Sequence, residues 1–127
     1  MNVIFCPNLT EFDEIEGQFK KLFNDLKKKH PKLFALVRTT IEKVKKSQNL
    51  SDLERQRWVS RLSEASLPIY EFRIPPTKKG GVVRLYFGYK KSDKNTIVIL
   101  TGELKHKKEA DPIKIKSAEK YYKEVCL

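Results

Sequence analysis

Four side chains in the middle of the chain could act together on a phosphate group. Glu71 and Arg73, and then Arg84 and Tyr86, alternate with apolar residues in two neighbouring β-rich runs. Because side chains alternate between the faces of a strand, these four would share the exposed face of a sheet whose other face packs on helices. Arginine presents paired N–H donors that fit phosphate oxygens. The pattern favours binding of a phosphate backbone, and a surface ion pair between Glu71 and Arg73 is the structural alternative.

Positive charge is concentrated around these strands. The 127-residue chain has a formal net charge of +11, and residues 73–108 hold ten Lys and Arg against two acidic residues. Most of the charge thus falls in the predicted sheet. A concentrated basic surface indicates a polyanionic partner, with nucleic acid first, an anionic membrane surface second and an acidic protein third. The alternative is a lysine-rich surface that serves solubility.

Several residues of this region are candidates for contact with nucleic acid. The lysines would bind phosphates, and tyrosine rings, Tyr86 or Tyr89, would stack on bases. The residues predicted to bind are Lys78, Lys79, Lys90, Lys105, Lys108 and Tyr86.

The helical part, about residues 10–64, comes before these strands. Asn2 to Cys6 is expected to form a short strand. Thr10 is expected to cap a helix whose first turns are acidic and whose apolar residues recur at helical spacing. His30 and the proline after it end this helix, and a second apolar stripe runs to about Lys46. Two antiparallel helices joined by a short turn are therefore expected.

A third, shorter helix is expected after these two. Ser51 and Glu54 have the spacing of a capping box, and the helix would continue through Leu62. It contains Trp58, which we interpret as a packing residue and not as a base-stacking one.

From residue 67 the apolar period changes from that of a helix to that of a strand. Short connections between three β-rich runs imply an antiparallel meander, and Pro112 can begin a last helix with its own apolar stripe. The three runs are Ile69 to Ile74, Val82 to Lys90 and Thr96 to Leu104.

The order of these elements predicts a single domain over residues 1–127 of the α+β class. An N-terminal strand and a helical hairpin would pack on a small antiparallel sheet, about residues 68–105. A C-terminal helix, about residues 112–125, would complete the fold.

Composition also bears on location and cofactors. Cys6 and Cys126 have neither metal-ligand spacing nor the density of a secreted disulfide scaffold. Neither a signal peptide nor an apolar run of roughly 20 residues is recognisable. We therefore expect a soluble cytoplasmic protein. We also expect no metal or other cofactor, because the sequence lacks a cluster of metal ligands and Gly80-Gly81 resembles a hairpin turn and not a phosphate loop.

The second half of the chain resembles the RelE/HigB/ParE superfamily of bacterial toxins from toxin-antitoxin pairs. The resemblance covers roughly residues 67–125 and rests on an ordered succession of short motifs: Ile69-Tyr70-Glu71-Phe72-Arg73, Val83-Arg84-Leu85-Tyr86-Phe87, Ile97 to Gly102, and the basic cluster followed by Pro112, Ile115 and Ala118. It implies a compact fold like that of microbial RNases, whose mRNA interferase members cleave messenger RNA, commonly on the ribosome.

The resemblance also implies site roles. Metal-free RNA cleavage needs a base for the 2′-hydroxyl, positive charge for the phosphorane and an acid for the leaving 5′-oxygen. By resemblance, Arg73 and Arg84 hold the phosphate. His106 is a possible acid or base because its reference pKa is near neutral, and Glu71 is a candidate base. Lys105, Lys107 and Lys108 are alternatives if neighbouring cations lower a lysine pKa.

This chain departs from the family pattern after the third strand of the predicted sheet. Leu104 stands where members usually have an aromatic residue, and the expected pair of basic residues falls on His106-Lys107 or on Lys107-Lys108.

Two other functions remain open from the sequence. A gyrase-poisoning toxin would share the fold without needing the acid-base set, and a non-catalytic nucleic-acid-binding domain would use the same cations for phosphate contacts. For the toxin, the expected partners are messenger RNA, the ribosome, and a cognate antitoxin with an acidic or amphipathic segment that covers the basic surface.

Overall fold

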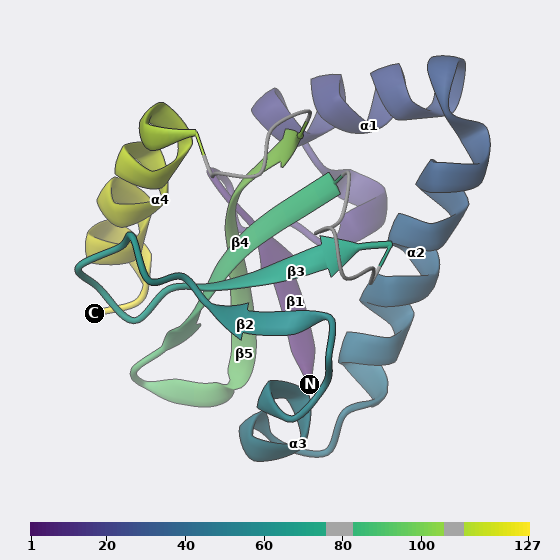
Figure 1. Ribbon diagram of the computed structural model, residues 1–127. Coiled ribbons are helices and arrows are strands. Elements are labelled where there is room, and N and C mark those ends of the chain that lie inside the picture. Colours follow the sequence, from purple (N-terminus) through teal and green to yellow (C-terminus); the bar gives the residue numbers. More distant parts are fainter. Residues whose placement is uncertain (76–82, 106–110) are drawn as a thin grey trace.

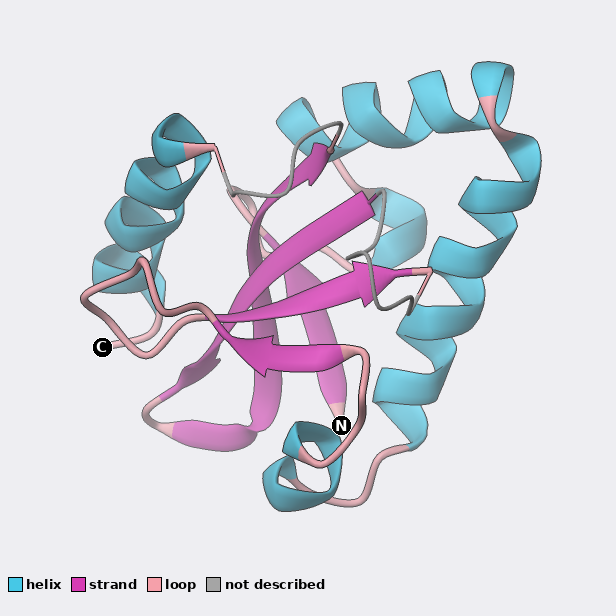
Figure 2. Ribbon diagram, in the orientation of Figure 1, coloured by secondary structure: helices cyan, strands magenta, loops and turns pink. Residues whose placement is uncertain are grey.

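The computed structural model describes residues 1–75, 83–105 and 111–127, and its mixed content confirms the α+β class (Figures 1 and 2). None of the described helices is both long and apolar enough to cross a membrane. Along the chain the elements are β1 (Asn2–Phe5), the short 3-10 helix η1 (Phe12–Glu14), α1 (Gly17–Lys29), α2 (Pro31–Lys46), α3 (Leu50–Glu54), β2 (Val59–Arg61), β3 (Tyr70–Ile74), β4 (Val83–Lys90), β5 (Asp93–Leu104) and α4 (Pro112–Val125).

The described strands form one five-stranded sheet in the order β1-β5-β4-β3-β2. The three strands predicted from the sequence form its centre, and their antiparallel pairing is confirmed. β1 lies parallel to β5 at one edge, and β2 pairs antiparallel with β3 at the other. The parallel pair is possible because the whole helical part separates β1 from β5 along the chain.

The helices cover both faces of this sheet (Figure 1). The apolar stripes of α1 and α2 pack on one face, against β3 and β4 residues such as Phe72, Leu85 and Phe87. α4 packs on the opposite face through Ile115, Ala118 and Tyr122, against Tyr86, Val98 and Leu100. Both cysteines are free and buried in this second core. The sheet is therefore a middle layer between two cores.

The first helix begins later than the sequence predicted. Thr10 does not cap it, because its backbone pairs with Phe5 in both directions at 2.8 and 3.2 Å. The acidic turn forms η1 instead, and α1 begins at Gly17, whose φ of +62° is a conformation that favours glycine. Phe12 still reaches the core from η1, so its apolar position was predicted although its helix was not.

His30 ends α1 and precedes α2, as predicted. The two helices nevertheless meet at a corner in Figure 1, so the expectation of an antiparallel hairpin is wrong. Each of the two helices buries its own apolar stripe against the sheet.

The third helix was predicted too long and with the wrong cap. Asn49, and not Ser51, accepts a hydrogen bond from the backbone N–H of Asp52 at 3.0 Å. The helix ends at Glu54, and Val59–Arg61 forms β2 because pairing with β3 satisfies its backbone groups. Trp58 packs on Phe72 with ring centroids 5.6 Å apart, which confirms its interpretation as a packing residue.

At Gly88 the side chains of α4 and of the residue that follows it leave no room for a side chain on the sheet. A methyl group there would come within 2.8 Å of Tyr122 Cδ2 and 3.3 Å of Cys126 Sγ. We expect Gly88→Ala to lower the free energy of unfolding by about 1–3 kcal/mol, because overpacking forces neighbours to shift. Urea denaturation checks this value. In a Tyr122→Leu background the cost should be smaller, and an equal cost in both backgrounds would contradict the steric explanation.

Candidate functional site

Polar side chains from four strands meet on the face of the sheet that carries α4. Ser60, Glu71, Tyr86 and Thr101 are paired in one row across β2, β3, β4 and β5. The neighbouring row contains Arg73, Arg84 and Glu103. Lys105 follows directly after β5 and is close enough to Arg84, Glu71 and Glu103 to interact with them electrostatically. We call these eight residues the polar cluster.

The centre of the polar cluster is a buried ion pair. Arg84 Nη1 lies 3.3 Å from Glu71 Oε2, and the two side chains are 10% and 9% exposed. The Ser60 hydroxyl donates to the other carboxylate oxygen of Glu71 at 3.1 Å. Both oxygens of Glu71 thus accept hydrogen bonds, one from Ser60 and one from Arg84. These contacts fix the position of the Arg84 guanidinium group.

Arg73 lies directly opposite Arg84 in the pairing of β3 with β4. Its Nη2 donates to the backbone oxygen of Arg57 at 2.5 Å, whereas its Nε–H is buried and has no hydrogen-bond partner among the described residues. Like charges directly opposite on a sheet repel each other. An anion between the two guanidinium groups would remove this repulsion and could accept a hydrogen bond from the buried Nε–H of Arg73.

Glu103 and Lys105 extend the polar cluster toward the start of α4. Glu103 lies opposite Arg84 in the pairing of β5 with β4. Its Oε2 accepts a hydrogen bond from the backbone N–H of Asp111 at 3.4 Å. Lys105 is buried, and its pKa is lowered, first by burial and then by the nearby Arg84 guanidinium. A lysine with a lowered pKa is better suited to proton transfer near neutral pH than an ordinary one.

Tyr86 corrects the prediction that this face of the sheet is exposed. Its side chain is 0% exposed because α4 covers it, so the ring cannot stack on a base in this conformation. Its hydroxyl is buried next to the Glu103 carboxylate. Burial raises the pKa of Tyr86, and the carboxylates of Glu103 and Glu71 raise it further. The predicted sharing of one face by Glu71, Arg73, Arg84 and Tyr86 is confirmed, and only the exposure was wrong.

The other residues predicted to bind or react fall into two groups. Lys90 is at the opposite end of β4, where it pairs with Asp93, and therefore lies apart from the polar cluster. The remaining predicted residues lie outside the described part of the chain: His106, Lys107, Lys108, Lys78 and Lys79.

Sequence reasoning missed Ser60, Thr101 and Glu103 as members of the polar cluster. Glu103 could have been found, because Thr101, Glu103 and Lys105 alternate along the strand with Gly102 and Leu104. Ser60 could not have been found, because the segment that contains it was expected to be helical. Only the pairing of β2 with β3 brings Ser60 to Glu71. Within the described residues, no three His, Cys, Asp or Glu side chains are grouped as a metal site requires.

The lowered pKa of Lys105 predicts a pH dependence of stability. Below its ordinary pKa of 10.5, the unfolded chain holds this proton more tightly than the folded one. The stability of the wild type relative to Lys105→Met should therefore rise as the pH is raised through the alkaline range toward 10.5. Urea denaturation of both proteins at several pH values in this window measures the difference, and a constant difference would contradict the burial of a charged lysine.

Comparison of the chain with models of protein families, with characterised proteins and with solved structures finds no match. The resemblance to the RelE/HigB/ParE superfamily therefore stays a prediction from the sequence.

Proposed function

We propose that this protein is an endoribonuclease that cleaves messenger RNA on the ribosome by acid-base chemistry without a metal, and that it acts as the toxin of a toxin-antitoxin pair. The observation that carries the proposal is the placement of Arg73 directly opposite Arg84, next to the buried Glu71 and Lys105. These are the charges that RNA cleavage requires, and the order of motifs resembles that of the mRNA interferases.

In this proposal the two arginines bind the scissile phosphate. Arg73 is the more exposed of the two, so the phosphate first meets its guanidinium group. Arg84 lies deeper and is oriented by Glu71. Together they stabilise the additional negative charge that develops on the phosphorus in the transition state.

Lys105 is the described residue best suited to move a proton. Its pKa is lowered toward the range in which a lysine can act as base or acid, and it lies within the electrostatic reach of Arg84. Glu71 is less suited to the role of base, because both of its oxygens already accept hydrogen bonds. His106 and Lys107, predicted for the same role, lie outside the described residues.

The toxin role implies that the chain is harmful when it is made without its antitoxin. Expression in bacteria should arrest growth and degrade messenger RNA, and co-expression of an acidic antitoxin encoded alongside should relieve the arrest. Arrest with intact messenger RNA and broken DNA would favour gyrase poisoning instead. Unimpaired growth, with RNA bound but not cleaved, would favour a non-catalytic nucleic-acid-binding domain.

A further inference from the structure

A second basic surface lies across the sheet from the polar cluster. Residues 17–46, which form α1 and α2, contain ten Lys and Arg and two acidic residues. The net charge of the whole helical part is lower than that of α1 and α2, because four acidic residues precede α1 in residues 11–16. Almost all of the lysines on α1 and α2 are exposed. A polyanion can therefore approach the protein from a side that the proposed nuclease site does not use.

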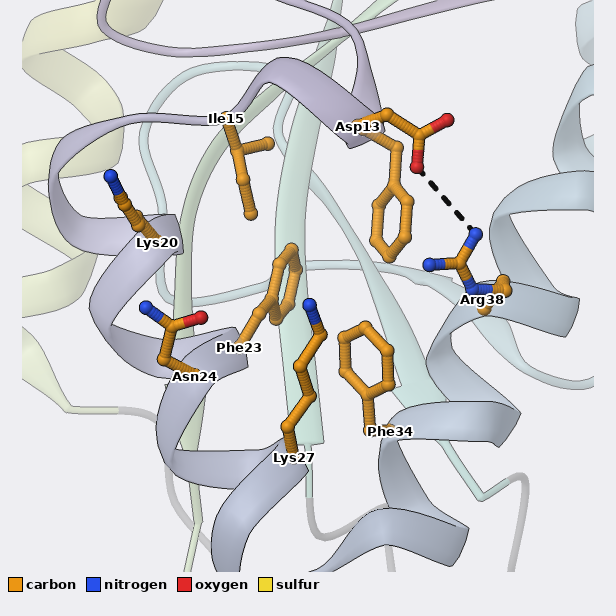
Figure 3. Close-up of a pocket in the computed structure, with 9 residues that line it drawn as sticks. Asp13, Ile15, Lys20, Phe23, Asn24, Lys27, Phe34 and Arg38 are labelled. Atoms are coloured by element: carbon orange, nitrogen blue, oxygen red, sulfur yellow. Dashed lines mark ion pairs between the residues drawn. The ribbon is translucent and has the colours of Figure 1, made fainter.

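A pocket opens on this surface where η1, α1 and α2 meet (Figure 3). Its volume is about 190 Å³, which exceeds the roughly 150 Å³ of a cavity that holds benzene. The rings of Phe12, Phe23 and Phe34 line its inner part, and its rim carries three cations: Lys20, Lys27 and Arg38.

The cations at this pocket lie next to aromatic rings. The Arg38 guanidinium carbon is 5.1 Å from the centroid of Phe12 and 5.6 Å from that of Phe34. The ammonium of Lys27 lies 4.9 Å from the centroid of Phe34. Bases of single-stranded nucleic acids stack on such rings and on the flat face of a guanidinium group. The pocket thus brings together aromatic rings and a guanidinium group, the two kinds of planar group that contact bases.

The charge of the pocket differs between its two sides. Arg38 pairs with Asp13 at 3.5 Å, which neutralises part of the charge on the η1 and α2 side. Lys20 and Lys27 form no ion pair with a described residue, and Figure 3 shows Lys20 on the side away from Asp13. A phosphate would be repelled by Asp13 and attracted by the two lysines. The anionic part of a ligand therefore belongs on the α1 side.

We propose that this pocket is a nucleotide-binding site, distinct from the proposed nuclease site and independent of it. The base contacts Phe34 and the Arg38 guanidinium group, and the phosphate is held by Lys20 and Lys27. The Asn24 side chain lines the same pocket and offers both a donor and an acceptor to the edge of the base. The same chemistry fits one unit of a single strand or a free nucleotide.

Chemical-shift mapping locates the bound ligand. We would titrate the ¹⁵N-labelled protein with the hexanucleotide (rA)₆ and separately with AMP. The proposal predicts shifts in the backbone amides of residues 20–27 and 34–38. If AMP alone produces them, a free nucleotide suffices; if only (rA)₆ does, the ligand is part of a strand. Shifts confined to β3, β4 and β5, or no shifts with either ligand, would overturn the proposal.

Two pairs of lysines on α1 provide a matched comparison. Lys20→Ala/Lys27→Ala removes two charges from the pocket, whereas Lys21→Ala/Lys28→Ala removes two exposed charges that do not line it. The first pair should weaken the ligand that produces the shifts about tenfold, and the second less than about threefold. Phe34→Leu should weaken it about fivefold or more, because stacking is lost. Equal weakening by both lysine pairs, or tighter binding of an acidic peptide than of (rA)₆ in the same pocket, would overturn the proposal.

Discussion

Replacing Arg73 with alanine is expected to lower the rate of RNA cleavage by about 100-fold or more, the effect of removing one transition-state donor at a preorganised site. The free energy of unfolding should change by less than about 1 kcal/mol, because Arg73 is half-exposed and its described hydrogen bond is to one backbone oxygen. Single-turnover cleavage of an RNA substrate on programmed ribosomes measures the first value, and urea denaturation the second.

Arg57→Ala is the matched control for this prediction. The side chain of Arg57 is exposed, and its backbone oxygen accepts the hydrogen bond from Arg73. The substitution removes one positive charge close to the polar cluster while Arg73 and its acceptor stay in place. Cleavage by Arg57→Ala should stay within about threefold of wild type if general charge contributes little. Equal losses in the two variants would mean that Arg73 acts only through the overall charge of the surface.

Replacing Arg84 with methionine is expected to have the largest effect on stability. The change removes the ion pair between Arg84 and the buried Glu71 carboxylate, and breaking such a pair costs about 3–5 kcal/mol. Cleavage should be lost as well, since the deeper phosphate contact is gone. Urea or thermal denaturation of the purified variant measures the loss of stability.

The double variant Glu71→Met/Arg84→Met separates stability from chemistry. Replacing both partners of a buried pair with apolar residues is often neutral or stabilising, so most of the stability lost in the single variant should return. Cleavage should stay absent, because neither guanidinium nor carboxylate is restored. If the double variant is as unstable as the single one, the pair is not the main electrostatic contact of Arg84. If it cleaves RNA normally, Arg84 has no part in the chemistry.

The sequence could place the centre of the site because strand alternation is a local property. Arg73 and Arg84 are each two residues from their partner on the same face, Glu71 and Tyr86, and short connections made antiparallel pairing the simple choice. Alternation assigns residues to a face, but it does not say what covers that face. The burial of Tyr86 depends on the docking of α4, a contact between distant segments.

The elements that were predicted wrongly depend on tertiary contacts in the same way. Thr10 has the side chain of a helix cap, yet its backbone pairs with Phe5. Ser60 lies in a segment with a helical pattern, yet β3 draws it into the sheet and brings it to Glu71. Local propensity is a weak guide where a sheet edge offers hydrogen-bond partners. The parallel pairing of β1 with β5 is likewise a contact between distant segments.

The location of the basic surfaces was predicted less accurately than the location of the apolar core residues. The net charge of residues 73–108 pointed to the polar cluster, but the equal excess on residues 17–46 was concealed by the acidic residues before α1. A count over α1 and α2 alone reveals the basic surface of these helices, and the start of α1 at Gly17, after the acidic residues, is known only from the fold. The pocket on the second surface depends on the corner between α1 and α2, which helical periodicity does not predict.

The most direct test of the central claim is a map of new RNA 5′ ends in bacteria that express the wild type, Arg73→Ala or Arg57→Ala. We predict new ends inside translated reading frames for the wild type and for Arg57→Ala, and none above background for Arg73→Ala. New ends of equal number in the wild type and in Arg73→Ala would contradict a nuclease site at the polar cluster, and the absence of new ends in the wild type would contradict RNA cleavage altogether.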